Sequence, residues 1–363
     1  MHSIIIDARM LFSSGIGVVL RNMLVYLAQA RLPYSWEIIV QNQEQKRWVE
    51  KKCSSATIIV ITAPIYSIKE QLAFLRLKSR DAKLFWSPHY NIPIFWQKKI
   101  ITTIHDVCHV AMPHFFKGFK KQSYARNMLR WSGKKSRSIV CVSEFTAKEF
   151  HKYTDCDPKK ICVIYNGVSQ DWFEVVKMEK SHSNPYILFV GNVKPHKNLD
   201  RLLDAFNQNK EHIPHDLVVV GKKEGFITGD KSIMQKAATL DNRVRFTGEV
   251  SDAQLKQYYA WADFLCFPSL YEGFGLPALE AMACGCPVLT SNVTSLPEVA
   301  GEAAVYCDPY SVEDMAEKLK FMVSLSEEKR QELISKGRER AKLFSWEKAG
   351  REFLDVIKKV AEE

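Results

Sequence analysis

The stretch that decides the fold is YEGFGLPALEAMACGCP, residues 271–287. It places Glu272 beside the glycine-broken turn at 273–275, and Glu280 in an apolar segment that has a proline near its start. A proline in the first turn of an otherwise apolar, helix-forming segment predicts a helix at 277–283. A carboxylate accepts two hydrogen bonds side by side, so each glutamate is suited to the vicinal hydroxyls of a ribose or a hexose.

The length and composition indicate a soluble protein of two domains. At 363 residues the chain suits two domains of about 150–200 residues each. Its 46% hydrophobic and 25% charged residues are ordinary for a globular protein. The start, MHSIIIDAR, predicts a strand rather than a signal peptide, and no apolar stretch reaches the roughly 20 residues of a spanning helix. Nine scattered cysteines indicate free thiols in a reducing cytoplasm; the CGC at 284–286 is tighter than usual zinc spacings.

Apolar strand-like runs alternate with helical patterns along the chain. The expected strands are 3–7, 36–41, 57–61, 83–86, 100–104 and 138–142, and then 186–190, 216–220, 244–247, 264–267 and 287–290. Helices are expected at 17–30 and 67–77, and then at 199–207, 252–261 and 277–283. The pattern restarts after a polar stretch at 171–185. This predicts two α/β domains, 1–172 and 173–345, each a doubly wound parallel sheet, which binds ligands at the carboxyl ends of its strands.

Two candidate sites follow strands of the first half. Gly15 and Gly17 lie where the first strand gives way to a helix, which is typical of a diphosphate site or of a turn without a ligand. Without a third glycine and a later acid they do not complete a dinucleotide fingerprint. His105 and Asp106 follow an apolar strand directly, so we expect this polar pair to face a cleft.

The second half opens with a stronger anion site. In ILFVGNVKPHKNL an apolar strand runs into Gly191 and then into a loop that carries Lys194, His196 and Lys197 before a helix. Because the start of a helix alone favours acids, cations at this place need a reason, and a bound phosphate supplies one. Carboxylates such as Glu272 and Glu280 would repel that phosphate, which leaves sugar hydroxyls as their partners.

Positive charge is concentrated at 98–137. This segment holds one acid, Asp106, and ten cations, which are Lys98, Lys99, Lys117, Lys120, Lys121, Arg126, Arg130, Lys134, Lys135 and Arg137. Aromatic and apolar residues are interleaved with the cations, at Phe115, Phe116, Phe119, Tyr124, Met128, Leu129 and Trp131. A helix at 117–135 with this composition fits either a solvated basic face or an anionic membrane surface. Nucleic acid would also be attracted to it, but no matching motif is present.

Taken together, these motifs resemble a glycosyltransferase family 4 enzyme of the GT-B fold, over nearly the whole chain. The carriers, in order, are GIG, SPHYNIP, HD, VSEFTAKEF, YNGV, VGNVKPHKNL, FTGEVSDAQL and YEGFGLPALEAMACGCPV. The last motif, with its Glu-x7-Glu spacing, is highly specific. The resemblance implies two Rossmann-like domains facing across a cleft, with a final helix at 346–363 that crosses back to the first domain.

The resemblance also implies a role for each matching residue. Lys197 would bind the donor phosphates, and Glu280 the ribose diol. Glu272 would contact the transferred sugar, and His105 would lie beside its anomeric carbon. The remaining donor-binding positions are backbone contacts at Gly15, Gly17, Gly191, Asn192, Val250, Gly273, Phe274, Gly275 and Leu276. Val18, Asn192 and His196 stand where many relatives have arginine, so phosphate binding would rest on Lys197 and Lys194.

The expected function is a retaining hexosyl transfer from a nucleotide-diphosphate sugar to a glycan or lipid-linked glycan. SPHYNIP and GIG resemble mannosyltransferases of bacterial surface polysaccharide, which favours GDP-mannose over a UDP-hexose. No cofactor, metal site or nucleic-acid partner is expected. The location would be cytoplasmic, on the inner membrane face if the 117–135 segment binds lipid. The alternatives are a GT-B epimerase or phosphorylase and a non-catalytic nucleotide-sugar-binding subunit.

Overall fold

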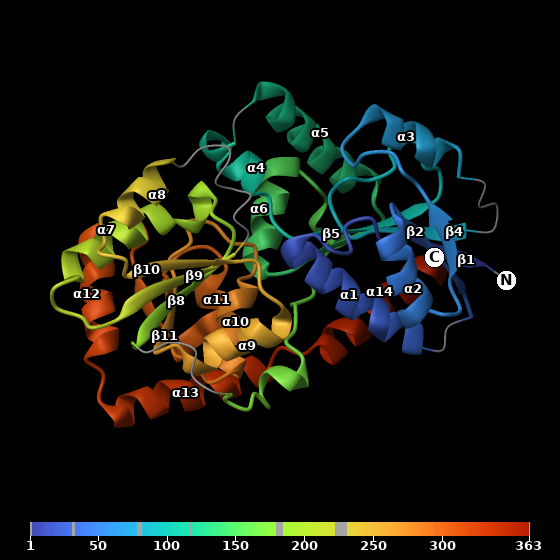
Figure 1. The fold of residues 1–363 in the computed structure, drawn as a ribbon. Coiled ribbons are helices and arrows are strands. Elements are labelled where there is room, and N and C mark those ends of the chain that lie inside the picture. Colours follow the sequence, from blue (N-terminus) through green and yellow to red (C-terminus); the bar gives the residue numbers. More distant parts are fainter. Residues whose placement is uncertain are drawn as a thin grey trace. The chain divides into compact units, whose positions relative to one another are not determined.

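The computed structural model describes residues 2–30, 33–77, 82–116, 118–178, 184–221 and 231–362. Lys117 and part of the expected linker at 171–185 lie outside these residues. The chain forms two compact units (Figure 1). Unit 1 is Met1–Gly167 with Trp346–Glu363, and unit 2 is Val168–Ser345.

Unit 1 is built on a parallel sheet of the order β3-β2-β1-β4-β5-β6-β7. The strands are β1 (Ser3–Asp7), β2 (Ser35–Val40), β3 (Thr57–Val60), β4 (Ala82–Ser87), β5 (Lys99–Ile104), β6 (Ser138–Cys141) and β7 (Ile161–Val163). Strands β1 and β4, in the middle of the sheet, are almost wholly buried, which is why their sequences are near-continuous apolar runs. The expectation missed β7, a three-residue, partly buried edge strand.

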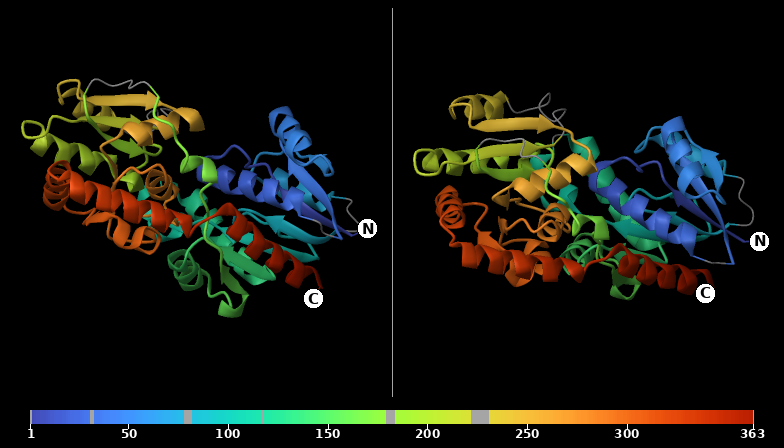
Figure 2. Two further views of the ribbon diagram at one scale, coloured as in Figure 1. Left: turned by 90° about the horizontal axis from the view of Figure 1, so that it is seen from below. Right: turned by 60° about the horizontal axis from the view of Figure 1, so that its bottom comes forward.

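The long helices of unit 1 are α1 (Ser14–Gln29), α2 (Gln43–Lys52), α3 (Ile68–Leu75), α5 (Phe119–Lys135), α6 (Glu144–Thr154) and α14 (Trp346–Glu362). A short helix, α4 (Cys108–Ala111), follows β5. The last helix of the chain, α14, packs against α1 in this unit (Figure 2). Their contact needs a glycine, because a Cβ at Gly350 would lie 2.4 Å from the ring of Tyr26.

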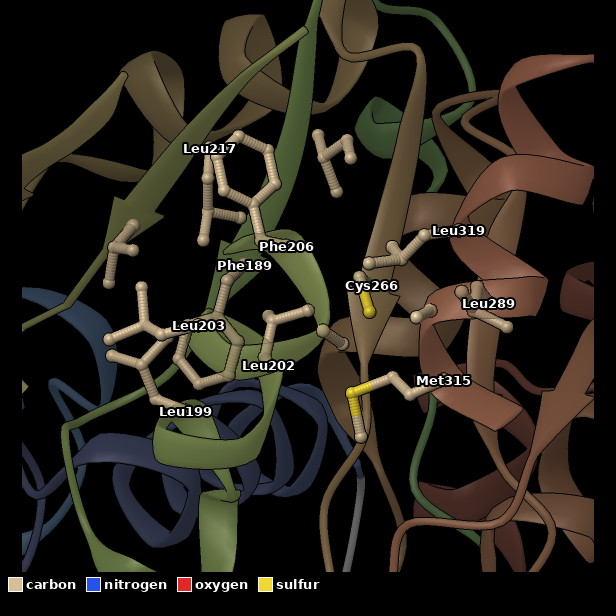
Figure 3. Close-up of a cluster of buried hydrophobic side chains, with 14 of the residues drawn as sticks. Phe189, Leu199, Leu202, Leu203, Phe206, Leu217, Cys266, Leu289, Met315 and Leu319 are labelled. Atoms are coloured by element: carbon tan, nitrogen blue, oxygen red, sulfur yellow. The ribbon is translucent and has the colours of Figure 1, made fainter. Parts of the chain in front are cut away.

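Unit 2 repeats the plan with the order β10-β9-β8-β11-β12-β13. Its strands are β8 (Tyr186–Val190), β9 (Asp216–Val220), β10 (Val244–Gly248), β11 (Phe264–Phe267), β12 (Val288–Ser291) and β13 (Val305–Cys307). Its helices are α7 (Leu199–Asn209), α8 (Lys231–Ala238), α9 (Asp252–Trp261), α10 (Leu276–Ala283), α11 (Leu296–Ala300), α12 (Val312–Val323) and α13 (Glu327–Lys342). Side chains of α7 and α12 fill the core with those of the sheet, among them Phe189, Phe206 and Leu319 (Figure 3).

Both sheets reverse their strand order at one place. In unit 1 the reversal lies between β1 and β4, and in unit 2 between β8 and β11. In open parallel sheets, ligands bind outside the carboxyl ends of the strands at such a switch point. The structure confirms the predicted doubly wound α/β architecture, and it directs attention to the loops after these four strands.

The basic segment of unit 1 is a helix whose apolar residues divide between two faces. Met128 and Leu129 are buried in unit 1, so these two of the interleaved apolar residues do not contribute to an exposed face. Ala125, Met128, Leu129 and Ser132 repeat at the helical spacing of a core-facing stripe. The large apolar side chains that α5 exposes are Phe119 and Trp131.

Candidate active site

The loop after β8 is held in place by a buried asparagine. Gly191 ends the strand, and a 3-10 turn over Pro195–Lys197 leads to Asn198, whose φ is +64°. The Asn198 side chain donates to the carbonyls of Pro268 (3.0 Å) and Pro309 (2.7 Å). The amide of Leu270 also donates to the carbonyl of His196, at 2.8 Å. The bonds to Pro268 and from Leu270 tie the lysine loop after β8 to the loop after β11, and the bond to Pro309 ties it to the loop after β13.

The two tied loops bring Lys197 and Glu272 together. Lys197 Nζ lies 2.5 Å from Glu272 Oε1, and both side chains are partly buried. The ammonium also lies 5.4 Å from the centre of the Phe267 ring. Because an ammonium has three N–H donors, the bond to Glu272 leaves two of them for a further acceptor. The pair therefore places a cation and a carboxylate side by side at the switch point of unit 2.

The glycine-rich turn after Glu272 is packed against α11. Ser295 Oγ donates to the backbone carbonyl of Glu272 at 3.0 Å. Gly275 has a φ of +100°, and a Cβ there would come within 2.6 Å of Leu296 Cδ2. Gly273 and Phe274 are buried, and α10 begins at the next residue after the turn, Leu276. The turn thus needs its glycine for both conformation and space.

Glu280 lies on α10 and is bound to the neighbouring helix. The hydroxyl of the fully buried Tyr259, on α9, donates to Glu280 Oε2 at 3.2 Å. Burial raises the pKa of Glu280 to about 7, while the bond from Tyr259 opposes the rise. Val250 immediately precedes the capping box that Ser251 forms at the start of α9. Glu280 and Val250 are therefore both linked to α9.

Three glycines end neighbouring strands of unit 2, a feature that the sequence analysis did not single out as a group. The amide of Gly191 donates to Val220 (2.9 Å), and that of Gly221 donates to Gly248 (3.0 Å). A Cβ at Gly221 would lie 2.1 Å from the carbonyl oxygen of Gly191. The available signal was a glycine at or directly after the end of each predicted strand. Their effect is to leave bare backbone at the carboxyl ends of β8, β9 and β10.

The other expected site residues lie in unit 1. Gly15 and Gly17 are in the first turn of α1, where a Cβ at Gly17 would come 2.6 Å from the carbonyl oxygen of Leu11. His105 follows β5, and its Nε2 lies 2.8 Å from the carbonyl oxygen of Pro88. Because a carbonyl only accepts, Nε2 carries the proton. Burial lowers the pKa of His105, which favours the neutral ring.

The described residues contain neither a membrane-spanning helix nor a cluster of metal ligands. None of the helices there is both long and apolar enough to cross a membrane. Across the same parts of the chain, His, Cys, Asp and Glu side chains form no group of three that could hold a metal ion.

Two family models match the chain in succession. Residues 14–172 match "Glycosyltransferase Family 4", and residues 170–340 match "Glycosyl transferases group 1". The chain is 29% identical over 292 residues to O-antigen chain mannosyltransferase B of Escherichia coli, which covers 77% of this chain and 75% of that protein. It is 32% identical over 237 residues to O-antigen chain mannosyltransferase RfbU of Salmonella typhimurium, covering 64% of this chain and 63% of that protein.

The fold has matches over the whole length of solved glycosyltransferases. The structure of Anabaena HepE in complex with UDP and glucose has a TM-score of 0.79 at 16% identity, and the match covers 99% of this chain and all of HepE. WaaG, a glycosyltransferase involved in lipopolysaccharide biosynthesis, has a TM-score of 0.72 at 18% identity, with 98% and 99% covered. The chain belongs to the GT-B glycosyltransferases, with a family 4 segment followed by a group 1 segment.

Proposed function

We propose that the protein is a retaining hexosyltransferase of cell-surface polysaccharide synthesis, which moves mannose from GDP-mannose to a glycan or lipid-linked glycan. The observation that carries the proposal is the contact between Lys197 and Glu272 at the switch point of unit 2. It joins a phosphate-binding cation to a sugar-binding carboxylate, which is what a nucleotide-sugar requires. The O-antigen mannosyltransferases among its relatives support mannose as the transferred sugar.

The proposed donor lies along the ends of β8, β10 and β11. Lys197 binds the diphosphate, helped by backbone amides around Gly191 and Asn192. Glu272 binds hydroxyls of the hexose, with the backbone of 273–276 alongside. Glu280 binds the ribose diol, and the backbone of Val250 contacts the base. For Gly15, Gly17 and His105 of unit 1, contact with the diphosphate and the hexose stays a prediction from the family resemblance.

In the proposed reaction the acceptor hydroxyl attacks the anomeric carbon on the face of the leaving group. A new bond forms between that carbon and the acceptor oxygen while the bond from the carbon to the phosphate oxygen breaks. The acceptor proton passes to a phosphate oxygen of the leaving nucleoside diphosphate. Lys197 stabilises the charge that develops on this diphosphate.

A donor screen tests the proposal. Thermal shift and nucleoside-diphosphate release are measured with GDP-mannose, UDP-glucose, UDP-galactose and UDP-GlcNAc. GDP-mannose is expected to raise the melting temperature most and to be turned over. A larger response to one of the UDP-sugars would identify that UDP-sugar, and not GDP-mannose, as the donor. The proposed transferase function would still hold. Binding without turnover in the presence of a crude lipid-linked glycan acceptor would favour a non-catalytic subunit.

The proposed chemistry needs no divalent metal, because Lys197 supplies positive charge at the diphosphate. Transfer activity should therefore be unchanged after treatment with EDTA. Loss of activity that magnesium or manganese restores would contradict this part of the proposal.

We also propose that unit 1 docks on the anionic inner surface of the cell membrane. Lys120, Lys121, Arg126 and Arg130 lie on the exposed side of α5, where Phe119 is 84% exposed. A second exposed apolar stripe lies on α3, at Ile68, Leu72 and Leu75. Each cation near an anionic surface contributes about 1 kcal/mol, and apolar side chains add to it.

Sedimentation with liposomes tests this docking. The protein should sediment with vesicles that contain anionic phospholipid and be released as the salt concentration rises. Replacing Lys120, Lys121, Arg126 and Arg130 by serine should abolish sedimentation and leave donor affinity unchanged. The matched control replaces four cations of unit 2, Lys318, Lys329, Lys336 and Lys342. Equal loss of liposome binding in both variants would show that the binding depends on the net charge of the protein and not on the surface of α5.

A further inference from the structure

The turn that carries Glu272 packs against residues near the end of α13, to which the proposed donor contacts assign no role. Phe274, two residues after Glu272, is buried in this turn. Its ring meets that of Phe344 edge to face, with 5.8 Å between the ring centres and 78° between the ring planes. Phe344 is also buried and lies two residues beyond the end of α13 at Lys342. A segment far along the chain therefore supports the turn.

An arginine of α13 fixes Phe344 relative to α11. The guanidinium carbon of Arg340 lies 5.2 Å from the centre of the Phe344 ring, which is within the range of a cation–π contact. Its Nε and Nη2 donate to the carbonyls of Val299 (2.9 Å) and Glu298 (2.6 Å), both in α11. The backbone of Phe344 is held as well, because its carbonyl accepts from the amide of Val168 at 3.1 Å. Phe344 is thus anchored through both its ring and its backbone.

These contacts form a closed circuit that passes through Glu272. Ser295, directly before α11, donates to the backbone carbonyl of Glu272 at 3.0 Å. From Glu272 the circuit runs along the turn to Phe274, and then through Phe344 and Arg340 back to α11. The backbone on both sides of the Glu272 carboxylate is therefore attached to one rigid group of residues.

The turn needs such attachment because its own sequence restrains it little. A glycine stands on each side of Phe274, and glycine has more conformational freedom to lose than any other residue. A carboxylate that binds a reacting sugar must be held in place, since a misplacement of about 1 Å can cost about 10²-fold in rate.

We propose that Phe344 and Arg340 are positioning residues, which set the place of the Glu272 carboxylate through Phe274 and α11. The inference rests on the proposed function, in which Glu272 binds the transferred hexose. It predicts that changes at Phe344 affect the sugar part of the donor and not the nucleotide part.

Steady-state kinetics and calorimetry on the full-length protein test this inference. The probes are GDP-mannose and free GDP, or the donor that responds in the screen and its nucleoside diphosphate. Phe344→Leu keeps apolar volume but removes the ring, and it should lower kcat by about tenfold, a smaller loss than that for a misplacement of 1 Å. Affinity for the free nucleotide, which has no hexose, should stay at the wild-type value. Arg340→Lys keeps the charge but not the planar group of donors, so it should act in the same direction.

A double substitution shows whether Phe344 acts through Glu272. In the Glu272→Gln background the carboxylate is already absent, so Phe344→Leu should lower kcat much less than it does in the wild type. If the two losses in kcat simply multiplied, Phe344 would affect the rate by another route, and the inference would be overturned.

The matched control uses the guanidinium–phenyl pair at the start of β10. Arg243 lies 5.3 Å from the centre of the Phe206 ring and donates to backbone carbonyls, among them that of Ile213 at 2.6 Å. Arg243 directly precedes β10, at the end of the sheet opposite to the lysine loop. Because Phe206 is wholly buried, Phe206→Leu should lower the melting temperature, yet it should keep the wild-type kcat below that temperature.

The possible results separate this inference from the proposed function. Wild-type kcat in Phe344→Leu, an equal loss of free-nucleotide affinity, or an equal loss of kcat in Phe206→Leu would overturn the positioning role alone. Absence of turnover by the wild-type protein with every donor would overturn the proposed function, and the positioning role with it.

Discussion

The two switch points have the same strand order but differ in the charge and the exposure of their side chains. In unit 2, one partly exposed lysine faces one glutamate, and glycines leave backbone bare at the ends of three strands. In unit 1, one buried arginine, Arg9, is held by two carboxylates, those of Asp7 and Glu70. In both units the strand order determines where a ligand binds. The charge that remains accessible at the switch point determines which kind of ligand binds there.

The physical basis of the difference is desolvation. The guanidinium of Arg9 is wholly buried and paired with Asp7 and Glu70, so its charge is balanced and out of reach of a ligand. The ammonium of Lys197 keeps donors and some exposure after it binds Glu272. At the switch points, Lys197 therefore remains available to an anionic ligand, whereas Arg9 does not.

The largest expected effect comes from removing the accessible cation. Lys197→Ala should lower transfer by about 10²–10³-fold, because the charge on the leaving diphosphate loses its stabilising group. The fold should persist, with a circular dichroism spectrum like that of the wild type. The measurement is the initial rate of nucleoside-diphosphate release at saturating acceptor.

The control for this substitution is Lys210→Ala, which breaks another lysine–acid pair of unit 2, with Asp241 at 3.1 Å. It should keep full activity. Wild-type activity in Lys197→Ala would remove the basis for placing the diphosphate in unit 2.

Substitutions of the two glutamates should have smaller effects, which distinguish the nucleotide-binding part of the site from the sugar-binding part. Glu280→Gln should weaken binding of free GDP by about 10–100-fold, since it removes charged hydrogen bonds to the ribose. Glu272→Gln should not weaken the binding of free GDP, because it releases Lys197 from its ion pair. It should nevertheless lower turnover of the donor. Isothermal titration calorimetry provides the comparison. Equal losses of GDP affinity in both variants would show that the glutamates do not have separate partners.

The smallest effect is a pH dependence. The pKa of Glu280 is raised to about 7 by burial, and the ribose requires the carboxylate, so GDP-mannose affinity should fall by about tenfold between pH 8 and pH 6. Tyr259→Phe removes a hydrogen bond that lowers this pKa, so the midpoint should move to higher pH. Glu280→Gln should show no such step. If the wild type, Tyr259→Phe and Glu280→Gln all showed the step at the same pH, a titratable group other than Glu280 would cause it.

The sequence was most informative about unit 2. Its strands were predictable because apolar runs such as 186–190 and 264–267 are buried on both faces of a parallel sheet. The contact of Lys197 with Glu272 follows from the fold, since both residues come after strands that flank the switch. The short edge strand β13, of three residues, was missed. Tyr259 was missed because a tyrosine in a helix is usually a core residue.

The sequence was least informative about unit 1. Glu70 lies in α3, far along the chain from Arg9, and a glutamate in the first turn of a helix is ordinarily a solvated acid. Only the folded chain shows that it is buried and bound to Arg9 and Asn91. Long-range partners of this kind leave no local pattern. The burial of Met128 and Leu129 on α5 was likewise not predicted, although they repeat with Ala125 and Ser132 at the helical period of a core-facing stripe.

Hydrogen–deuterium exchange, read by mass spectrometry with and without GDP, tests the central claim that unit 2 binds the nucleotide. Nucleotide binding should slow amide exchange in peptides that cover 191–199 and 272–280. Peptides that cover Tyr66, His89 and Asn91 should exchange as they do in the free protein. Protection of these unit 1 peptides, with none in the unit 2 segments, would contradict the assignment of donor binding to the β8 and β11 loops.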